Sequence, residues 1–386
     1  MSREPWILKL RSVTARASDG RRAIVFSSNT AWNLANFRGP IIAALVADGL
    51  RVIAAAAADG TESKLAELGA EFWPIPVEAA SRNPLHDLRL FLSFLALFRK
   101  ERPAALLTFT VKPNVYGTIA GRLAGVRCIA TVSGLGSAFL AGGLTANILD
   151  RLYRLAFKGA DAVFFQNDDD RNLFLQRNLV DARQVRRVPG SGVDLDRFKL
   201  AELPNGARPV FLLIARMLRD KGVAEFIEAA RLLSERRPAP RLVMVGGAGV
   251  DNPSAVPFSE IERWVDDGMI EYAGAMEDVR PAIAAADCVV LPSYREGLPR
   301  SLLEGSAMGR PLIATDVPGC RDVVEDGVNG FLCAPRSAES LAEAIRRMAD
   351  LSPKQRAAMG RQSRRKVESA YSVSQVVAAY RTELAF

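Results

Sequence analysis

Short apolar runs alternate with segments of helical spacing along this chain, and the alternation starts twice. The first series predicts strands over 23–28, 51–57, 104–109, 128–132 and 162–166. The second series predicts strands over 209–214, 241–245, 269–272, 288–291, 312–315 and 330–333. Strands that alternate with helices indicate a parallel, doubly wound sheet, because parallel neighbours need a crossover connection. The chain is therefore predicted to be α/β, with two Rossmann-like domains facing a cleft.

The predicted domain boundary lies at the junction near 189–204. A length of 386 residues suits two domains of about 100–200 residues each. We expect an N-terminal domain over 1–190 and a C-terminal domain over 191–369, with a last helix near 370–386 that packs back on the first domain. Ligands of such sheets bind beyond the carboxyl ends of the strands, so functional residues are expected there.

Positive charge is concentrated in the first half of the chain. Residues 1–190 contain 25 Lys and Arg against 16 Asp and Glu, a net charge of +9, whereas residues 191–386 have a net charge of −1. A basic half favours phosphate-rich partners, an anionic membrane surface or nucleic acid, and ordinary solvated faces are the alternative.

Several classes of protein are excluded by composition. No run approaches the roughly 20 apolar residues of a membrane-spanning helix, and residues 1–22 lack the apolar core of a signal peptide. Four scattered cysteines and a single histidine, His86, argue against a Cys/His metal site and against a disulfide framework. We therefore expect a cytoplasmic protein.

The most informative segment is 293–304, which follows the predicted strand 288–291. A helix is expected to open at Pro299, where free amides and the helix dipole can receive an anion. Glu296 lies just before this helix and Glu304 lies in its first turns. Eight residues of ideal helix would span about 12 Å, so the two carboxylates could hold opposite ends of one extended ligand. Solvated glutamates on a surface helix are the alternative.

A basic segment follows the predicted strand 209–214. It contains Arg216 and Lys221, and Gly222 then leads into a helix. A planar guanidinium and a compact ammonium are the two usual ways of binding phosphate. Taken alone, a solvated basic loop explains these residues equally well, and Arg219 is expected on such a solvated face.

In order and spacing, these segments resemble the retaining family 4 glycosyltransferases with the two-domain GT-B architecture. Glu296 and Glu304 reproduce the E-x7-E spacing of that family, and the resemblance covers almost the whole chain. The segments that carry it in the second half are 188–194, 216–221, 317–319 and 325–330. Segments 108–114, 131–136 and 165–167 look like the branch that builds bacterial surface glycans on lipid carriers.

The resemblance implies that the second domain binds the donor and the first binds the acceptor. Arg216 and Lys221 would bind the donor diphosphate and stabilise it as a leaving group, and Glu296 would contact hydroxyls of the donor sugar. These three form the implied catalytic set. The implied donor-binding residues are Gly246, Gly297, Leu298, Pro299 and Glu304. The acceptor-side candidates are Asn36, Arg38, Lys112, Gly134 and Gly136.

The implied reaction moves a sugar, an N-acetylhexosamine or a related hexose of a UDP-sugar, onto a lipid-linked saccharide with retained configuration. It needs no metal and no cofactor besides the nucleotide-diphosphate sugar as co-substrate. A nucleotide-sugar epimerase of the same architecture is the first alternative. A basic nucleic-acid or membrane adaptor is the second, but no compact nucleic-acid motif is visible, so nucleic acid is not expected as a partner.

Three remaining features bear on ligands. His86 lies upstream of the strand end where many relatives place a histidine, so we expect it to cap a helix or to lie at the surface. The Asp168–Asp170 run allows either a metal site or an acidic helix start, and the helix start is simpler. Apolar segment 88–98 is most simply a buried helix, and segment 137–149 could be a loop that reaches lipid. Together with the basic first half, the two segments suit peripheral contact with the anionic inner face of the cell membrane.

Overall fold

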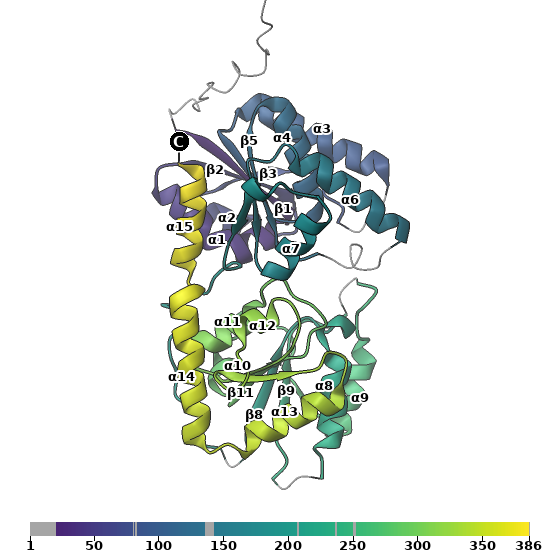
Figure 1. Cartoon of the computed structure of the whole chain (residues 1–386), viewed down its shortest axis with the longest axis vertical. Coiled ribbons are helices and arrows are strands. Elements are labelled where there is room, and N and C mark those ends of the chain that lie inside the picture. Colours follow the sequence, from purple (N-terminus) through teal and green to yellow (C-terminus); the bar gives the residue numbers. More distant parts are fainter. Residues whose placement is uncertain are drawn as a thin grey trace, which may run out of the picture. The chain divides into compact units, whose positions relative to one another are not determined.

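The structure is a computed structural model that describes residues 21–79, 81, 83–135, 143–206, 208–235, 238–249 and 252–385. The chain divides into two compact units (Figure 1). Unit 1 comprises Met1–Ser191 with Val376–Phe386, and unit 2 comprises Gly192–Gln375. The first crossing thus lies beside the predicted boundary, and the chain returns to unit 1 at Val376 rather than near residue 370.

Unit 1 is built on a parallel sheet with the order β3-β2-β1-β4-β5-β6-β7. The order reverses between β1 and β4, which makes their carboxyl ends the topological switch point. The two strands missed from sequence, β3 and β7, are short and lack a buried apolar run. The strands are β1 Ala23–Thr30, β2 Arg51–Ala57, β3 Glu71–Pro74, β4 Ala105–Thr108, β5 Arg127–Val132, β6 Ala162–Phe165 and β7 Val185–Arg187.

Helices cover both faces of this sheet. Apolar side chains of α3 and α4 pack on β1, β2 and β4, and those of α6 and α7 pack on β5 and β6. Tyr380 of α15 contacts Phe164 and Thr131, which alternate with those strand residues, so α15 covers the opposite face. The helices are α1 Ala31–Ala47, α2 Glu62–Glu67, α3 Pro84–Glu101, α4 Thr118–Ala124, α6 Gly143–Phe157, α7 Asp168–Gln176 and α15 Val373–Leu384, with the π-helix η2 Pro113–Gly117 and the 3₁₀ turn η3 Ala182–Gln184.

The prediction that the first helix opens at Gly39–Pro40 is wrong. α1 begins at Ala31, because the Thr30 side chain caps it by accepting a hydrogen bond from the Asn33 amide, and Pro40 lies within the helix. Buried positions recur with helical spacing on both sides of Pro40, which holds the two halves in one helix. The polar stretch before residue 39 is therefore mostly the first half of α1.

Unit 2 is built on a second parallel sheet, with the order β10-β9-β8-β11-β12-β13 and a switch point between β8 and β11. The prediction of two doubly wound parallel sheets is thus confirmed. The strands are β8 Val210–Ile214, β9 Arg241–Val245, β10 Glu271–Tyr272, β11 Cys288–Leu291, β12 Leu312–Thr315 and β13 Gly330–Cys333.

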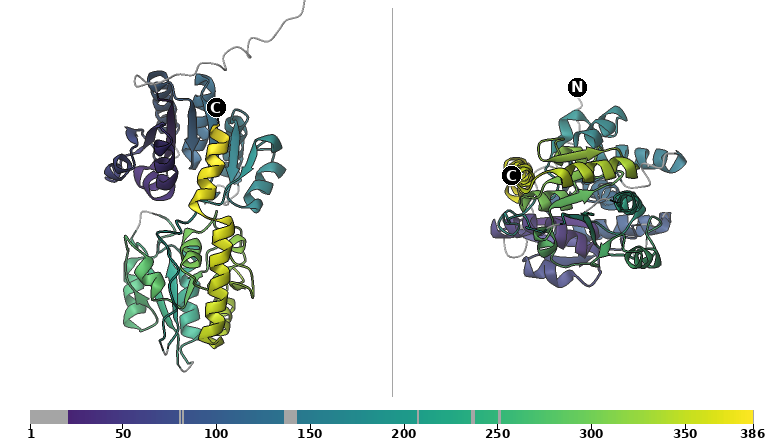
Figure 2. Two further views of the ribbon diagram at one scale, coloured as in Figure 1. Left: turned by 90° about the vertical axis from the view of Figure 1, so that its left-hand side faces the viewer. Right: turned by 90° about the horizontal axis from the view of Figure 1, so that it is seen from below.

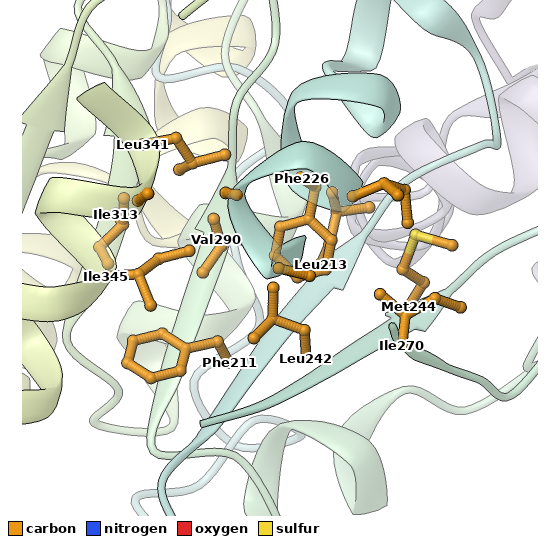
Figure 3. Packing of buried hydrophobic residues seen from close by; sticks show 14 of the residues in the cluster. Phe211, Leu213, Phe226, Leu242, Met244, Ile270, Val290, Ile313, Leu341 and Ile345 are labelled. Atoms are coloured by element: carbon orange, nitrogen blue, oxygen red, sulfur yellow. The ribbon is translucent and has the colours of Figure 1, made fainter. Parts of the chain in front are cut away.

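The sheet of unit 2 is buried between two helical layers (Figure 2). On one face Phe211, Leu213 and Val290 pack against Phe226 of α8 and Leu341 of α13 (Figure 3). Burial on both faces explains why these strands are continuous apolar runs. The helices are α8 Val223–Leu232, α9 Phe258–Asp266, α10 Arg280–Ala284, α11 Arg300–Ala307, α12 Cys320–Val323, α13 Ala338–Asp350 and α14 Pro353–Ala370, with the 3₁₀ turn η4 Arg219–Lys221.

Candidate active site

The switch point of unit 2 brings together a lysine, a glutamate and a serine. Lys221 Nζ lies 2.6 Å from Glu296 Oε1, and Ser293 Oγ donates to the same oxygen at 2.7 Å. Lys221 ends η4 beyond β8, and the other two follow β11. The side chains of Lys221 and Glu296 are 20% and 15% exposed, so partial burial strengthens their attraction relative to a pair in open water. The structure thus joins two of the predicted catalytic residues.

Two glycines allow the loops of this site to approach closely. Gly222 has φ +73°, and a Cβ there would meet the carbonyl oxygen of Pro292 at 2.1 Å. Gly319 has φ +81°, and a Cβ there would meet the carbonyl oxygen of Glu296 at 2.7 Å. Side chains at these positions would separate the loops that follow β8, β11 and β12. Lys221 and Glu296 are therefore fixed by backbone packing as well as by their own contact.

Two buried hydroxyl groups help to position Glu296, one by a direct hydrogen bond from Ser293 and one through Ser293. Ser293 is completely buried, and the Thr315 hydroxyl donates to its backbone carbonyl. Cys320 lies nearby, and burial, followed by the charge of Glu296, raises the pKa of its thiol well above the ordinary value. Cys320 therefore stays a protonated thiol at neutral pH rather than a nucleophile.

Glu304 is in the first turns of α11 and points inward. Its side chain is 9% exposed, and it pairs with Arg300 Nε at 2.6 Å. Burial raises the pKa of Glu304, and the charges of Arg300 and Arg197 oppose that shift. The alternative of a solvated glutamate therefore does not hold at this position. The helix start expected at Pro299 is confirmed to within one residue, because Pro299 is the N-cap of α11, and Glu296 lies before the helix as expected.

The other predicted donor residues lie on the same strand-end loops. Arg216 is exposed beyond β8. Gly246 follows β9, where its amide donates to Gly274 and its carbonyl accepts from the Tyr272 hydroxyl. Gly297 is buried, Leu298 packs against the core, and Pro299 caps α11 one residue before the helix begins. The sequence analysis did not identify Ser293, Thr315 or Arg300 as site residues, because none of them belongs to a motif. Ser293 contacts Glu296, Thr315 contacts Ser293, and Arg300 contacts Glu304.

The acceptor-side candidates of unit 1 are more scattered. Asn36 donates to the Trp32 carbonyl one turn earlier in α1. Arg38 is buried, with its guanidinium 4.4 Å from the centre of the Phe109 ring, and its contact with an acceptor stays a prediction. Gly134 follows β5, and Gly136 lies outside the described residues.

Lys112 is held in a small ionic cluster beyond β4. Its ammonium lies 2.7 Å from Asp87 Oδ1, and the Tyr116 hydroxyl donates to Asp87 Oδ2 at 2.7 Å. Nearer the switch point, the Thr110 hydroxyl donates to Asn29 Oδ1 at 2.8 Å, which links the ends of β4 and β1. Sequence reasoning missed Asn29 and Thr110, although each directly follows or ends an apolar strand.

The remaining sequence features are placed as follows. His86 lies in the first turn of α3, where its Nδ1 is 2.6 Å from Glu78. Asp168–Asp170 form the acidic first turn of α7, so the interpretation as a helix start is confirmed. Among the described residues, no three Asp, Glu, His or Cys side chains converge as a metal site would require, and no helix has the length and apolar character to cross a membrane.

Comparison with known proteins decides the family. Residues 36–190 match the family model described as glycosyl transferase 4-like domain, and residues 208–350 match the model described as glycosyl transferases group 1. The two matches fall on units 1 and 2. The chain belongs to the GT-B glycosyltransferases.

This glycosyltransferase is similar to curated bacterial enzymes over most of its length. It is 29% identical to the N,N'-diacetylbacillosaminyl-diphospho-undecaprenol alpha-1,3-N-acetylgalactosaminyltransferase of Campylobacter jejuni, covering 83% of this chain and 88% of the relative. It is 26% identical to the UDP-Gal:alpha-D-GlcNAc-diphosphoundecaprenol alpha-1,3-galactosyltransferase of Escherichia coli, covering 72% and 74%. Sucrose-phosphate synthase of Thermosynechococcus elongatus has the same fold, with a TM-score of 0.78 at 21% identity over 95% of this chain and 100% of that one.

Proposed function

We propose that this protein is a retaining glycosyltransferase that moves a sugar from a UDP-sugar onto a lipid-linked saccharide in bacterial surface-glycan assembly. The observation that carries the proposal is the contact of Lys221 and Ser293 with one oxygen of Glu296 at the switch point of unit 2. The names of the Campylobacter and Escherichia relatives support the acceptor class, because both specify a diphospho-undecaprenol carrier. They also support an N-acetylhexosamine or a hexose as the transferred sugar.

The pair of Lys221 and Glu296 suits the two ends of the reacting bond. An ammonium on a flexible stem neutralises a departing diphosphate, and a carboxylate accepts hydrogen bonds from sugar hydroxyls. With 2.6 Å between their charged atoms, a donor whose sugar and phosphate are adjacent would meet both groups together. Arg216, exposed on the same loop, would add a second positive charge on the diphosphate side.

Glu304 would bind the ribose hydroxyls of the donor. Its burial and its pairing with Arg300 fix the carboxylate in one position, as recognition of a rigid diol requires. The buried backbone at Gly297, Leu298 and Pro299 would form the wall between sugar and phosphate, and Gly246 would lie near the base. In this arrangement unit 2 binds the donor and unit 1 presents the acceptor.

The proposed step is a front-face displacement. The bond between the anomeric carbon and the diphosphate oxygen breaks, the diphosphate leaves with the electron pair, and the acceptor hydroxyl oxygen bonds to the same face of that carbon. The hydroxyl proton passes to the departing phosphate oxygen. Catalysis then rests on positioning and on charge stabilisation by Lys221 and Arg216, without a metal or a protein nucleophile. We further propose that the enzyme works in the cytoplasm, in peripheral contact with the inner face of the cell membrane.

A donor screen followed by a transfer assay tests this function. We expect UDP-sugars to raise the melting temperature more than GDP- or ADP-sugars, because binding to the folded state alone is stabilising. The donor that responds should then deliver labelled sugar to an undecaprenyl-diphosphate saccharide in the presence of a metal chelator, with NMR of the product showing retained configuration. An epimer formed from donor alone would support the epimerase instead, and inverted product would contradict the proposed displacement.

A further inference from the structure

Helices α3, α4 and α6 form one continuous outer face of unit 1, which we call the α3–α4–α6 face. α4 contacts both α3 and α6, and the three helices lie together in Figure 1. This face carries six large aliphatic side chains that are at least half exposed. They are Leu85, Leu88 and Leu92 on α3, Leu123 on α4, and Ile148 and Leu155 on α6.

The charge of the same face has one sign. Among the described side chains of these three helices, every exposed charged residue is basic, namely Arg89, Arg99, Lys100, Arg122, Arg151 and Arg154. The acidic residues of the helices are turned inward and paired. Asp87 pairs with Lys112, Glu101 with Arg51, and Asp150 with Arg177.

The opposite face of unit 1 has no such pattern. The exposed residues of α1 within the described chain are Trp32, Pro40 and Ala47. The exposed residues of α15 are small or polar apart from Arg381, which pairs with Asp48. The combination of aliphatic and basic side chains is therefore a property of one face and not of the unit as a whole.

We propose that the α3–α4–α6 face docks on the anionic surface of a lipid bilayer, which deepens the proposed function and rests on it. Leucines at 85, 88 and 92 form one stripe on α3, so they can enter the interface together, while basic side chains around them reach phosphate headgroups. Nucleic acid would leave six aliphatic side chains without a partner, and lipid accommodates both kinds of group.

The position of the stripe also favours lipid. Leu85 lies in the first turn of α3, two residues before Asp87, the carboxylate that holds Lys112. The apolar stripe thus begins at the edge of the sheet where unit 1 is proposed to receive its acceptor. With the stripe in the lipid interface, the acceptor side of unit 1 would lie level with the lipid headgroups, where the diphosphate of a membrane-bound acceptor is also found.

Vesicle binding tests this proposal. The full chain is sedimented with vesicles of phosphatidylcholine alone and of phosphatidylcholine mixed with phosphatidylglycerol. We expect binding to the mixed vesicles, which weakens as salt rises from about 0.1 M to about 1 M and the Debye length falls from about 10 Å to about 3 Å. The variant L85S/L88S/L92S should bind the mixed vesicles at least about tenfold more weakly, since burying even one leucine is worth about that factor.

Charge reversal and a matched control complete the design. The affinity of R89E/R99E for the mixed vesicles should fall about fivefold or more for each reversed residue, and its affinity for phosphatidylcholine alone should not change. The control L200S/L232S/V265S replaces exposed apolar residues of unit 2 and should bind as the wild type does. All of these residues are exposed, so we expect the melting temperatures to be unchanged.

Equal vesicle binding by wild type and L85S/L88S/L92S would overturn the proposal. So would a wild-type dimer that this variant abolishes, because the face would then bind a second copy of the chain. The donor thermal shift is recorded on every variant, since it depends on unit 2. A normal donor response without vesicle binding contradicts the docking face alone, whereas vesicle binding without any donor response contradicts the proposed function.

Discussion

Each unit has a lysine–carboxylate pair beyond the carboxyl ends of its strands, and the two pairs are bound differently. In unit 2, Lys221 and Ser293 both donate to Oε1 of Glu296. In unit 1, Lys112 donates to Oδ1 of Asp87 and Tyr116 to Oδ2, so separate donors use the two oxygens. The distances are nearly equal, 2.6 Å and 2.7 Å between the charged atoms.

The difference shows how the same pair can serve two purposes. Each carboxylate oxygen has two lone pairs, so Lys221 and Ser293 can both donate to Oε1 of Glu296 without competing. Glu296 lies on a strand-end loop at the switch point, where a sugar hydroxyl can donate to its carboxylate and an incoming phosphate can attract the Lys221 ammonium. Asp87 lies in the first turn of α3 and accepts one donor on each oxygen, from Lys112 and from Tyr116. Burial, followed by the bond to Asp87, raises the pKa of the Tyr116 hydroxyl, which keeps it a donor. We interpret the unit 2 pair as a ligand-binding group and the unit 1 pair as a structural support for Lys112.

The largest expected effect is on turnover in Lys221→Ala. Loss of the ammonium removes stabilisation of the departing diphosphate, a contribution of about 3–4 kcal/mol, so kcat should fall by about a hundredfold to a thousandfold. The matched control is Lys112→Ala, which removes the lysine of the other pair and should leave donor affinity unchanged. Full turnover in Lys221→Ala would show that the two pairs do not differ in the way proposed.

The next effect is on the stability of unit 1. Asp87→Ala removes the shared acceptor of Lys112 and Tyr116, and Lys112 is only 11% exposed. Leaving the Lys112 ammonium without its partner and with little access to water should lower the free energy of unfolding by about 2 kcal/mol. Chemical denaturation should show this as a lower midpoint denaturant concentration with an unchanged m-value. Donor binding should not change. A variant as stable as the wild type would mean that Asp87 is not the support of this cluster.

The strands of this fold could be predicted from sequence where both of their faces are buried, because such strands are continuous apolar runs. β11, β12 and β13 begin and end at the predicted residues, because both faces of these strands are covered. β3 and β7 were missed because they are partly exposed, and the start of α1 was missed because its first turns carry polar residues. Periodicity fails in the first half of α1 because its buried positions there, Ala31, Leu34 and Arg38, include only one large apolar residue.

The site was predictable only as far as its residues belong to a motif. Lys221 and Glu296 lie 75 positions apart, and the family spacing suggested their convergence before the structure gave their distance. The burial of Arg38 could not be predicted, because an arginine in a polar stretch is expected to be exposed and its contact with Phe109 is visible only in the structure. The roles of Ser293 and Thr315 could not be predicted, because a small hydroxyl residue at a strand end indicates a function only once its hydrogen-bond partner is known.

Ser293→Ala tests whether the shared oxygen matters. Without this donor the Glu296 carboxylate loses a hydrogen bond to a charged group, and we expect kcat to fall about tenfold with KM for the donor little changed. Ser293→Thr keeps the hydroxyl and should restore most of the loss, which separates positioning of Glu296 from general packing. A fall in stability without a change in kcat would reduce Ser293 to a structural role.

The smallest expected effect concerns Glu304, whose position is a cost to folding. Because burial raises its pKa in the folded state, the folded protein binds more protons than the unfolded chain between the ordinary pKa of 4.5 and the raised value. Stability from this group therefore falls as pH rises through that window. Glu304→Gln mimics the neutral form and removes the fall, so its free energy of unfolding should match or exceed that of the wild type above the window, and the advantage should shrink toward pH 4.5 and below. Donor affinity should nevertheless drop, because the ribose would lose a charged acceptor. Denaturation curves of both proteins measured from acid to neutral pH, together with a donor titration at neutral pH, check both parts. If the variant becomes less stable relative to the wild type as pH rises, the bond of Glu304 to Arg300 outweighs the cost of burial.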